Sequence, residues 1–226
     1  MTGDSGRDRA AVLFDVDGTL VDSNYLHVAA WAQAFQTVGH PVPAWRIHRA
    51  IGMDSARLLQ ELLGPEASAL GDRAAEEHKR AYAETTPLLR PLPGARELIA
   101  FLAERGVAVV LATSAPPDEL DRLRAVLKVD ELLTAVTTAD DVETAKPEPD
   151  LIQVAIHRSG CSPDRVVFVG DAVWDMRAAA RAGVGRIGLL SGGTSEAELR
   201  AAGAEETYAD AVDLLAHIFG SRLALW

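Results

Sequence analysis

The chain has 226 residues, a formal net charge of −11 and a single cysteine, and 48% of its residues are hydrophobic. This composition predicts a folded globular protein with one α/β domain, alone or with a smaller insertion, and the lone Cys161 excludes an internal disulfide and a cysteine-based metal site. The acidic balance argues against a nucleic-acid partner, and apolar runs such as Val107–Ala112 are far shorter than a membrane span, so we expect a cytoplasmic protein with no membrane partner.

The first predicted element is a buried strand over the apolar residues Ala11–Phe14, which leads into the sequence D-V-D-G-T-L-V-D. Because side chains alternate along a strand, Asp15 and Asp17 point to the same side at its C-terminal end, where open α/β sheets bind ligands. Two close carboxylates repel each other, and a bound cation is the usual way to hold both ionised. An Asp-Gly turn after an edge strand is the alternative interpretation.

Helical periodicity without a strand pattern follows as far as residue 84, interrupted at Gly39, Gly52 and Gly64. A proline-rich segment over residues 86–94, T-P-L-L-R-P-L-P-G, then predicts a stiff hinge. We therefore expect an all-helical insertion at residues 23–86 within a core formed by residues 1–22 and 87–226. The predicted helices of the insertion are Asn24–Val38, Ala44–Ala50, a segment from about Ser55 to Leu63, and Ala67–Glu84.

Beyond the hinge, helical and strand patterns alternate. Such alternation implies right-handed crossovers and a parallel sheet covered by helices on both faces. The predicted fold class is therefore α/β, with a Rossmann-like parallel-sheet core and an inserted all-helical domain. The predicted strands are Val107–Thr113, Ala135–Thr138, Val166–Val169 and Val184–Leu190, and the predicted helices are Ala95–Arg105, Pro117–Leu127, Pro149–Ser159, Trp174–Ala182 and Asp210–Phe219.

Two of the later segments carry residues suited to an anion. Thr113 and Ser114 follow a strand and precede a helix opened by proline, where a hydroxyl and free amide groups either bind an anion or cap the helix. Lys146 lies in T-A-K-P-E-P-D, and the following Pro147 favours an extended backbone at the lysine. Its ammonium group either reaches the edge of the sheet, where it would neutralise a phosphoryl oxygen, or stays in solvent.

A second pair of carboxylates follows the strand V-V-F-V. Asp171 comes directly after Gly170, and Asp175 follows one helical turn later, so both side chains can face one point. Oxygen ligands of this kind suit magnesium. The alternative for Asp175 is a surface acid favoured by the start of the helix.

Taken in chain order, these motifs resemble those of the haloacid dehalogenase-like (HAD) hydrolases. D-V-D-G-T-L-V, with Asp15 and Asp17, is similar to the first motif of that family, and the other three motifs follow in the family's order at Thr113, at Lys146 and at Gly170-Asp171 with Asp175. The helical insertion lies where the family has its type I cap domain. The resemblance covers essentially the whole chain and implies a cap domain at 23–86.

The resemblance implies a phosphatase reaction. Asp15 would be the nucleophile that forms an aspartyl phosphate, and Asp17 would be the general acid and then the general base. Thr113, the amide of Ser114 and Lys146 would bind the phosphoryl oxygens. The expected partner is a small-molecule phosphate ester, and we expect a monomer or a small homo-oligomer.

The resemblance also implies a Mg²⁺ cofactor. Its expected ligands are the Asp15 carboxylate, the Asp17 backbone carbonyl and the Asp171 carboxylate. Asp175 would bind the ion or orient a water molecule on it.

Three activities of the family can be weighed against the motifs. Dehalogenation does not fit, because that chemistry does not keep the second aspartate, and Asp17 is present. The segment D-S-N-Y-L-H-V-A-A-W is similar to that of β-phosphoglucomutase, in which a histidine at the position of His27 helps to control the acid/base aspartate. Met53 stands near the arginine expected in such a mutase, and the spacing of Asp171 and Asp175 is phosphatase-like, so a phosphatase is favoured and a mutase is the alternative.

The cap is expected to select the substrate. His27, Gly52 and Met53 are the candidate substrate-binding residues, because the first lies on a helix face towards the hinge and the other two lie in the loop expected to face the catalytic aspartates. A hydrogen-bonded interdomain histidine is the alternative for His27. Lys79 and Arg80, on a mostly polar helix, are interpreted as solvated.

A function of another class stays open: a HAD-like protein that binds phosphate or a partner without turnover. The intact set of Asp15, Asp17, Lys146 and Asp171 argues against it, since a binding protein needs no nucleophile.

Overall fold

Six parallel strands form one sheet, and they are β1 (Ala11–Phe14), β2 (Ala108–Ala112), β3 (Ala135–Thr137), β4 (Val166–Gly170), β5 (Gly185–Leu189) and β6 (Glu206–Tyr208). The computed structural model describes residues 9–142 and 146–225. The strand order is β3-β2-β1-β4-β5-β6. Phe14 at the end of β1 pairs with Leu111 of β2 and Val169 of β4, so the carboxyl ends of these three strands lie level at one edge of the sheet.

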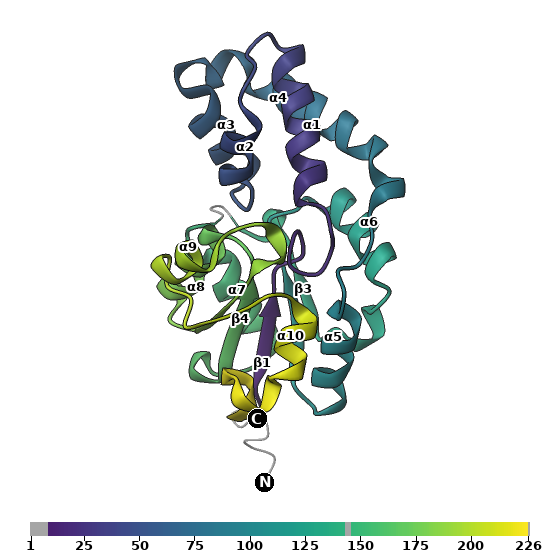
Figure 1. The fold of residues 1–226 in the computed structure, drawn as a ribbon, viewed down its shortest axis with the longest axis vertical. Helices are drawn as coiled ribbons and strands as arrows, with labels where there is room; N and C mark the ends of the chain where they lie inside the picture. The colour runs from purple at the N-terminus through teal and green to yellow at the C-terminus, as the bar shows by residue number, and fades with distance from the viewer. Residues whose placement is uncertain (1–8, 143–145, 226) are drawn as a thin grey trace.

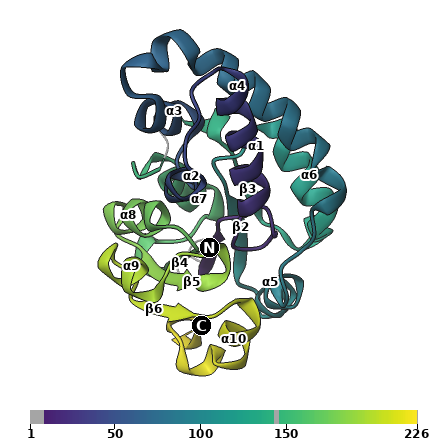
Figure 2. The same ribbon diagram turned by 45° about the horizontal axis from the view of Figure 1, so that its top comes forward.

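Helices cover both faces of the sheet (Figure 2). Alternate residues of β1 are buried on opposite faces, because Val12 and Phe14 join one hydrophobic cluster while Ala11 and Leu13 join the other. The first cluster is completed by α5 (Ala95–Glu104), α6 (Pro117–Leu127) and α10 (Ala211–Ala216), and the second by α7 (Asp150–Ser159), α8 (Val173–Ala182) and α9 (Glu196–Ala201).

Four helices form the insertion: α1 (Asn24–Thr37), α2 (Ala44–Ala50), α3 (Ser55–Leu63) and α4 (Ala67–Glu84). They lie beyond the carboxyl ends of the strands, at the top of Figure 1. Their own hydrophobic cluster includes Trp31, Phe35, Ile47 and Leu62, and Trp174 from the core packs against it. The insertion therefore stands over the edge of the sheet where ligands bind in α/β proteins.

The structure confirms the predicted fold class, a parallel α/β core with an all-helical insertion. The sequence-based prediction is wrong at the C-terminal end, where it lacks β6 and α9 and extends the last helix to Phe219, whereas α10 ends at Ala216. β6 is a three-residue edge strand, Glu-Thr-Tyr, without an apolar run, and α9 contributes only Leu199 to the buried residues. Such short elements leave no periodic pattern in a sequence.

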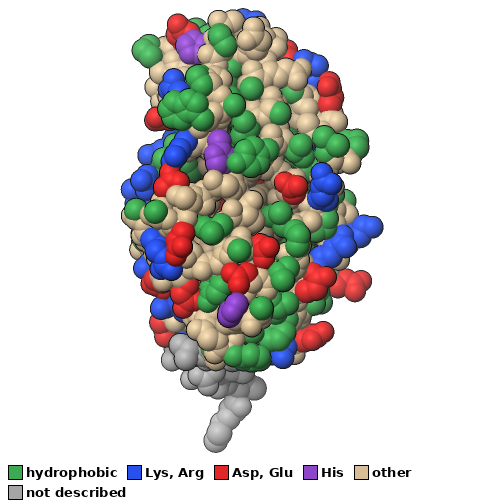
Figure 3. Space-filling view, viewed as in Figure 1, with side chains coloured by type: hydrophobic (Ala, Val, Ile, Leu, Met, Phe, Trp, Pro, Cys, Tyr) green, Lys and Arg blue, Asp and Glu red, His purple; other side chains and the backbone are tan. Residues whose placement is uncertain are grey.

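No helix within residues 9–142 and 146–225 is long and apolar enough to cross a membrane. On the face shown in Figure 3, acidic and basic side chains are interspersed, and no broad basic area is visible on it.

Candidate active site

The predicted site residues converge because three neighbouring strands end at the same level. The Asp15 amide donates a hydrogen bond to the Val169 carbonyl (3.0 Å), which places Asp15 beside the end of β4. Asp171 follows β4 directly, and Thr113 follows β2. Gly18, which follows Asp17 in the chain, has φ +73° and turns the backbone. A Cβ atom at Gly18 would lie 2.6 Å from the Asp171 carboxylate, so glycine is required for this close approach.

Lys146 lies beneath the site and joins two carboxylates. Its Nζ atom is 2.5 Å from Oδ1 of Asp15 and 2.8 Å from Oδ1 of Asp175, and only 1% of its side chain is exposed. Asp171 receives hydrogen bonds from the Thr19 hydroxyl (2.8 Å) and the Asn24 amide (2.8 Å). The lysine that the sequence left open between solvent and the sheet edge is therefore fully buried among the acids.

Burial dominates the electrostatics of these groups. Burial raises the pKa of Asp15 well above its ordinary value, although Lys146 opposes the shift. Burial and the neighbouring Asp175 raise the pKa of Asp171 to about 7. Burial alone would lower the pKa of Lys146, but the Asp15 and Asp175 carboxylates outweigh it and raise that pKa above its ordinary value.

The carboxylates of Asp15, Asp171 and Asp175 fit a divalent cation. One oxygen of each lies within 4.8 Å of the others, and all three residues are buried. Lys146 supplies one positive charge against three negative charges, and buried charges of one sign are stable only when they are compensated or protonated. Hard oxygen ligands with a net negative charge suit Mg²⁺. The Asp17 carboxylate, in contrast, belongs to a different cluster, with His27 and Glu119.

Thr113 and Ser114 offer hydroxyl groups that can donate to an anion. The Thr113 hydroxyl accepts a hydrogen bond from the Ala115 amide (3.0 Å), which leaves its own proton available. The Ser114 hydroxyl oxygen is buried and has no hydrogen-bond partner in the described part of the chain. A buried hydroxyl without a partner is costly, and a bound phosphoryl oxygen would satisfy it.

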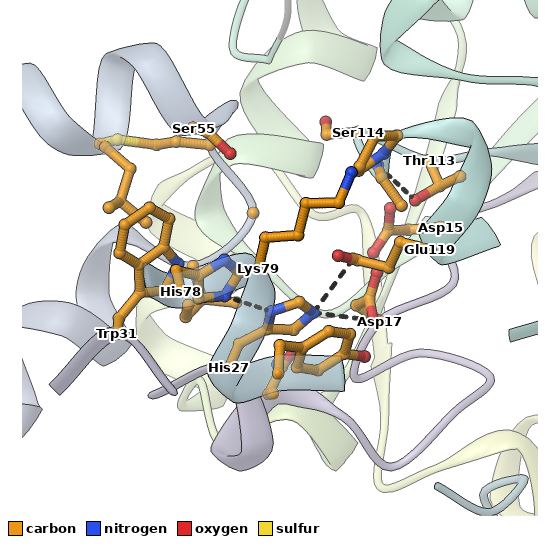
Figure 4. Close-up of a pocket in the computed structure, with 18 of the residues that line it drawn as sticks. Asp15, Asp17, His27, Trp31, Ser55, His78, Lys79, Thr113, Ser114 and Glu119 are labelled. Carbon is orange, nitrogen blue, oxygen red and sulfur yellow. Dashed lines mark hydrogen bonds and ion pairs between the residues drawn. The ribbon is translucent and has the colours of Figure 1, made fainter. Parts of the chain in front are cut away.

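One pocket of about 310 Å³ collects most of the predicted residues (Figure 4). Lys146 and Asp175 do not line the pocket. Lys146 contacts Asp15 directly, and Asp175 contacts Lys146 and belongs to the same carboxylate cluster as Asp15. The insertion closes the pocket with apolar side chains that include Trp31 and Leu58. The predicted site residues that line it are Asp15, Asp17, His27, Gly52, Met53, Thr113, Ser114 and Asp171.

His27 lies at the centre of a network that the sequence analysis only partly foresaw. Its Nε2 atom is 3.4 Å from the Asp17 carboxylate and 3.3 Å from that of Glu119, and its Nδ1 atom is 3.1 Å from Nε2 of His78 (Figure 4). The ring of His27 stacks on Tyr82, with centroids 3.9 Å apart. The sequence analysis did not identify Glu119 of α6 and His78 of α4 as site residues, because the residue that both contact, His27, lies on a different helix, α1.

The charges in this network follow from its surroundings. Burial would lower the pKa of His27, but Glu119 and Asp17 raise it to about 10, so His27 is a cation. Burial and the cationic His27 lower the pKa of His78 to about 2, so His78 stays neutral and its Nε2 atom accepts the hydrogen bond from the Nδ1–H group of His27. Burial is the largest single influence and opposes ionisation of Asp17, but the hydrogen bond and charge of His27, the hydrogen bond from Ser23 and the charge of Lys146 together outweigh it and lower the pKa of Asp17.

The cap loop 51–54 docks onto the segment that carries the acids. The Trp174 indole donates a hydrogen bond to the Arg49 carbonyl (3.1 Å), at the end of α2. Gly52 has φ +92°, and a Cβ atom there would lie 2.9 Å from the Cβ of Ala172. Met53 is 9% exposed and lines the pocket, so it forms part of the wall.

Replacement of Gly52 by Ala is expected to lower kcat/KM by roughly tenfold, because a displaced loop misplaces the substrate. Gly39→Ala is the matched control, since Gly39 also has a positive φ (+82°) but nothing lies within 4 Å of a Cβ atom there. Both variants should lose thermal stability, measured as Tm, because both positions have a positive φ, and Gly52→Ala should lose more because its Cβ also meets Ala172. Equal kcat/KM values for the two variants would contradict a docking role for Gly52.

Comparison with known proteins agrees with this geometry. Residues 10–183 match the haloacid dehalogenase-like hydrolase family. This chain belongs to that family.

Named relatives and a solved structure are similar over most of the chain. The phosphorylated carbohydrates phosphatase of Thermotoga maritima is 32% identical over 185 residues, which cover 78% of this chain and 83% of the relative. The phosphoglycolate phosphatase of Pseudomonas putida is 29% identical over 188 residues, 80% of this chain and 69% of the relative. The crystal structure of a hydrolase from Pseudomonas syringae has a TM-score of 0.89 and 39% identity, and the match covers 94% of this chain and 99% of that one.

Proposed function

We propose that this protein is a magnesium-dependent phosphatase that hydrolyses small phosphate monoesters through an aspartyl phosphate on Asp15. The observation that carries the proposal is that Asp15, Lys146 and Asp171 lie together at the base of one pocket, which the helical insertion covers. The relatives' names, a phosphorylated carbohydrates phosphatase and a phosphoglycolate phosphatase, support a small phosphorylated substrate.

The proposed chemistry uses the two aspartates that follow β1. Lys146 holds Oδ1 of Asp15, which leaves Oδ2 to attack the phosphorus while the bond to the leaving oxygen breaks. Asp17 passes to that oxygen a proton that the adjacent cationic His27 can supply, and it then takes one from the water that hydrolyses the aspartyl phosphate. The hydroxyl groups of Thr113 and Ser114 bind the phosphoryl oxygens throughout.

Asp15, Asp171 and Asp175 would hold the Mg²⁺, with the Asp17 backbone carbonyl as the further proposed ligand. When bound, the ion neutralises charge on the transferred phosphoryl group. Lys146 favours the ionised form of Asp15 from the opposite side, and Thr19 and Asn24 fix the orientation of Asp171.

The test is the release of phosphate from p-nitrophenyl phosphate and from a panel of sugar phosphates by protein freed of metal with EDTA. Activity is expected to depend on added Mg²⁺. If no substrate is hydrolysed with or without the ion, a binding protein without turnover becomes the better explanation.

A phosphosugar mutase of the β-phosphoglucomutase type is the alternative that the same assay separates. A mutase converts a phosphosugar to its isomer, requires a bisphosphate primer and releases little phosphate. Met53, which stands near the arginine expected to bind the second phosphate in such a mutase, lines the pocket without supplying a cation. This observation favours hydrolysis.

A further inference from the structure

The loop at residues 190–193, directly after β5, lies between the carboxylate cluster and the insertion. It is anchored to the turn that follows β1, because the Ser191 hydroxyl donates a hydrogen bond to the Gly18 carbonyl (2.7 Å). Gly192 is buried, and it packs so closely on the site that a Cβ atom there would overlap the Asp171 carboxylate. The backbone of this loop is therefore in direct contact with a proposed metal ligand.

The Gly192 carbonyl holds the side chain that orients Asp171. Nδ2 of Asn24 donates hydrogen bonds to Oδ2 of Asp171 (2.8 Å) and to the Gly192 carbonyl (3.2 Å). A carbonyl oxygen only accepts, so this contact fixes which side of the amide carries the nitrogen. Oδ1 of Asn24 is buried and has no hydrogen-bond partner within residues 9–142 and 146–225. Apart from the bond to Asp171 itself, the orientation of this amide therefore depends on the Gly192 carbonyl.

The insertion reaches the same carbonyl through His48 of α2. Its Nε2 atom is 3.0 Å from the Gly192 oxygen, and because a carbonyl cannot donate, Nε2 is the donor. The imidazole ring is half-buried and stacks on Tyr25 of α1, with ring centroids 5.1 Å apart. One backbone oxygen thus joins a helix of the insertion to the amide that orients a proposed metal ligand.

We propose that His48, on the insertion, is a positioning residue that strengthens Mg²⁺ binding at Asp171, on the core. Its hydrogen bond to the Gly192 carbonyl keeps that oxygen in place as the second acceptor of Asn24. Asn24 in turn holds the Asp171 carboxylate in the orientation that binds the ion. His48 does not line the pocket, so it acts on a ligand of the ion and not on the substrate. This inference rests on the proposed function, which places the cation at Asp171.

The dissociation constant (Kd) of Mg²⁺ tests the role of His48 without a turnover assay. It is measured on the full chain, freed of metal with EDTA and then dialysed, from the rise of Tm with Mg²⁺ at pH 8 and constant ionic strength. His48→Phe keeps an aromatic ring against Tyr25 but removes the donor, and it should raise the Kd about fivefold, the size expected for one neutral hydrogen bond. His48→Gln keeps an N–H donor and should stay within about twofold of the wild type.

Two further variants separate positioning of the ligand from docking of the insertion. Arg49 is next to His48 on α2 and forms an ion pair with Glu198 of α9, so it also ties the insertion to the core, but outside this series of hydrogen bonds. Arg49→Ala should therefore leave the Kd unchanged. Asn24→Ala should raise the Kd about tenfold or more. In that background His48→Phe should have little further effect, because His48 acts through Asn24.

The outcomes keep the two proposals apart. A Kd for His48→Phe within about twofold of the wild type, equal Kd values for the Phe and Gln variants, or the same rise in Arg49→Ala would each overturn the role of His48. An undiminished effect of His48→Phe in the Asn24→Ala background would overturn it as well. All of these results leave the phosphatase proposal intact. If Mg²⁺ does not raise the Tm of the wild-type protein, the metal site and the magnesium-dependent function are instead rejected.

Discussion

Replacement of Asp15 by Asn is expected to reduce turnover by roughly 10⁴-fold or more while the protein stays folded, because the amide cannot form the aspartyl phosphate. The fold should tolerate the change, since Asn has nearly the same shape and the buried acid already has a raised pKa. In the absence of metal, the Tm of the variant should equal or exceed that of the wild type, because one fewer carboxylate competes for Lys146. Steady-state kinetics and thermal unfolding monitored by circular dichroism provide the two measurements.

Asp22→Asn is the matched control for this variant. The same chemical change is made seven positions further along, at a side chain that is 51% exposed and lies 3.6 Å from Arg90 at the surface. Its activity should stay near that of the wild type. Turnover of the Asp15 variant within tenfold of the wild type would exclude Asp15 as the nucleophile.

Mg²⁺ is expected to raise the Tm by about 5–10 °C at pH 8 when it is present at roughly 100 times its Kd, and by much less at pH 5. The pKa of Asp171 is raised by burial from 3.8 to about 7. Between pH 3.8 and about 7, Asp171 keeps its proton in the folded metal-free protein but has lost it in the unfolded chain. The contribution of Asp171 to the free energy of unfolding therefore falls as the pH rises through this range. A cation must displace that proton, and its binding therefore strengthens as the pH passes 7.

The quantity to measure is the difference in Tm with and without the ion at each pH, because groups outside the carboxylate cluster, including His27 and His78, contribute to both values. Asp171→Asn should reduce the difference and flatten its dependence on pH. NaCl at equal ionic strength controls for screening. A Mg²⁺ effect that is as large at pH 5 as at pH 8 would contradict a site built from carboxylates with raised pKa values.

Local sequence pattern was sufficient for much of the core. The apolar run of β1 followed by Asp15 and Asp17 is readable because strand, turn and acids are contiguous, and the same holds for β4 with Asp171. The burial of Lys146 is different, because nothing local distinguishes a lysine before proline from a solvated one. Its place in the order of the family's motifs indicated the position that the structure shows.

The parts of the pocket that were missed depend on pairs distant in sequence. His78 meets His27 from 51 positions away, since α4 packs along α1, and Glu119 reaches the same ring from α6. The periodicity of a helix tells which face is buried but not which partner it meets. The pairing of Lys79 with Asp118 across the pocket mouth is invisible in the sequence for the same reason.

Trp174 links the helical insertion to the proposed cation ligands. Its ring packs against the hydrophobic cluster of the insertion, and it directly precedes Asp175 in the chain. Separating the insertion from the core would expose this indole to water, so the contact stabilises the observed arrangement. The first turn of α8 thus contacts the insertion through Trp174 and the carboxylate cluster through Asp175. The position of the insertion over the pocket and the orientation of the acids beneath it therefore depend on the same turn of helix.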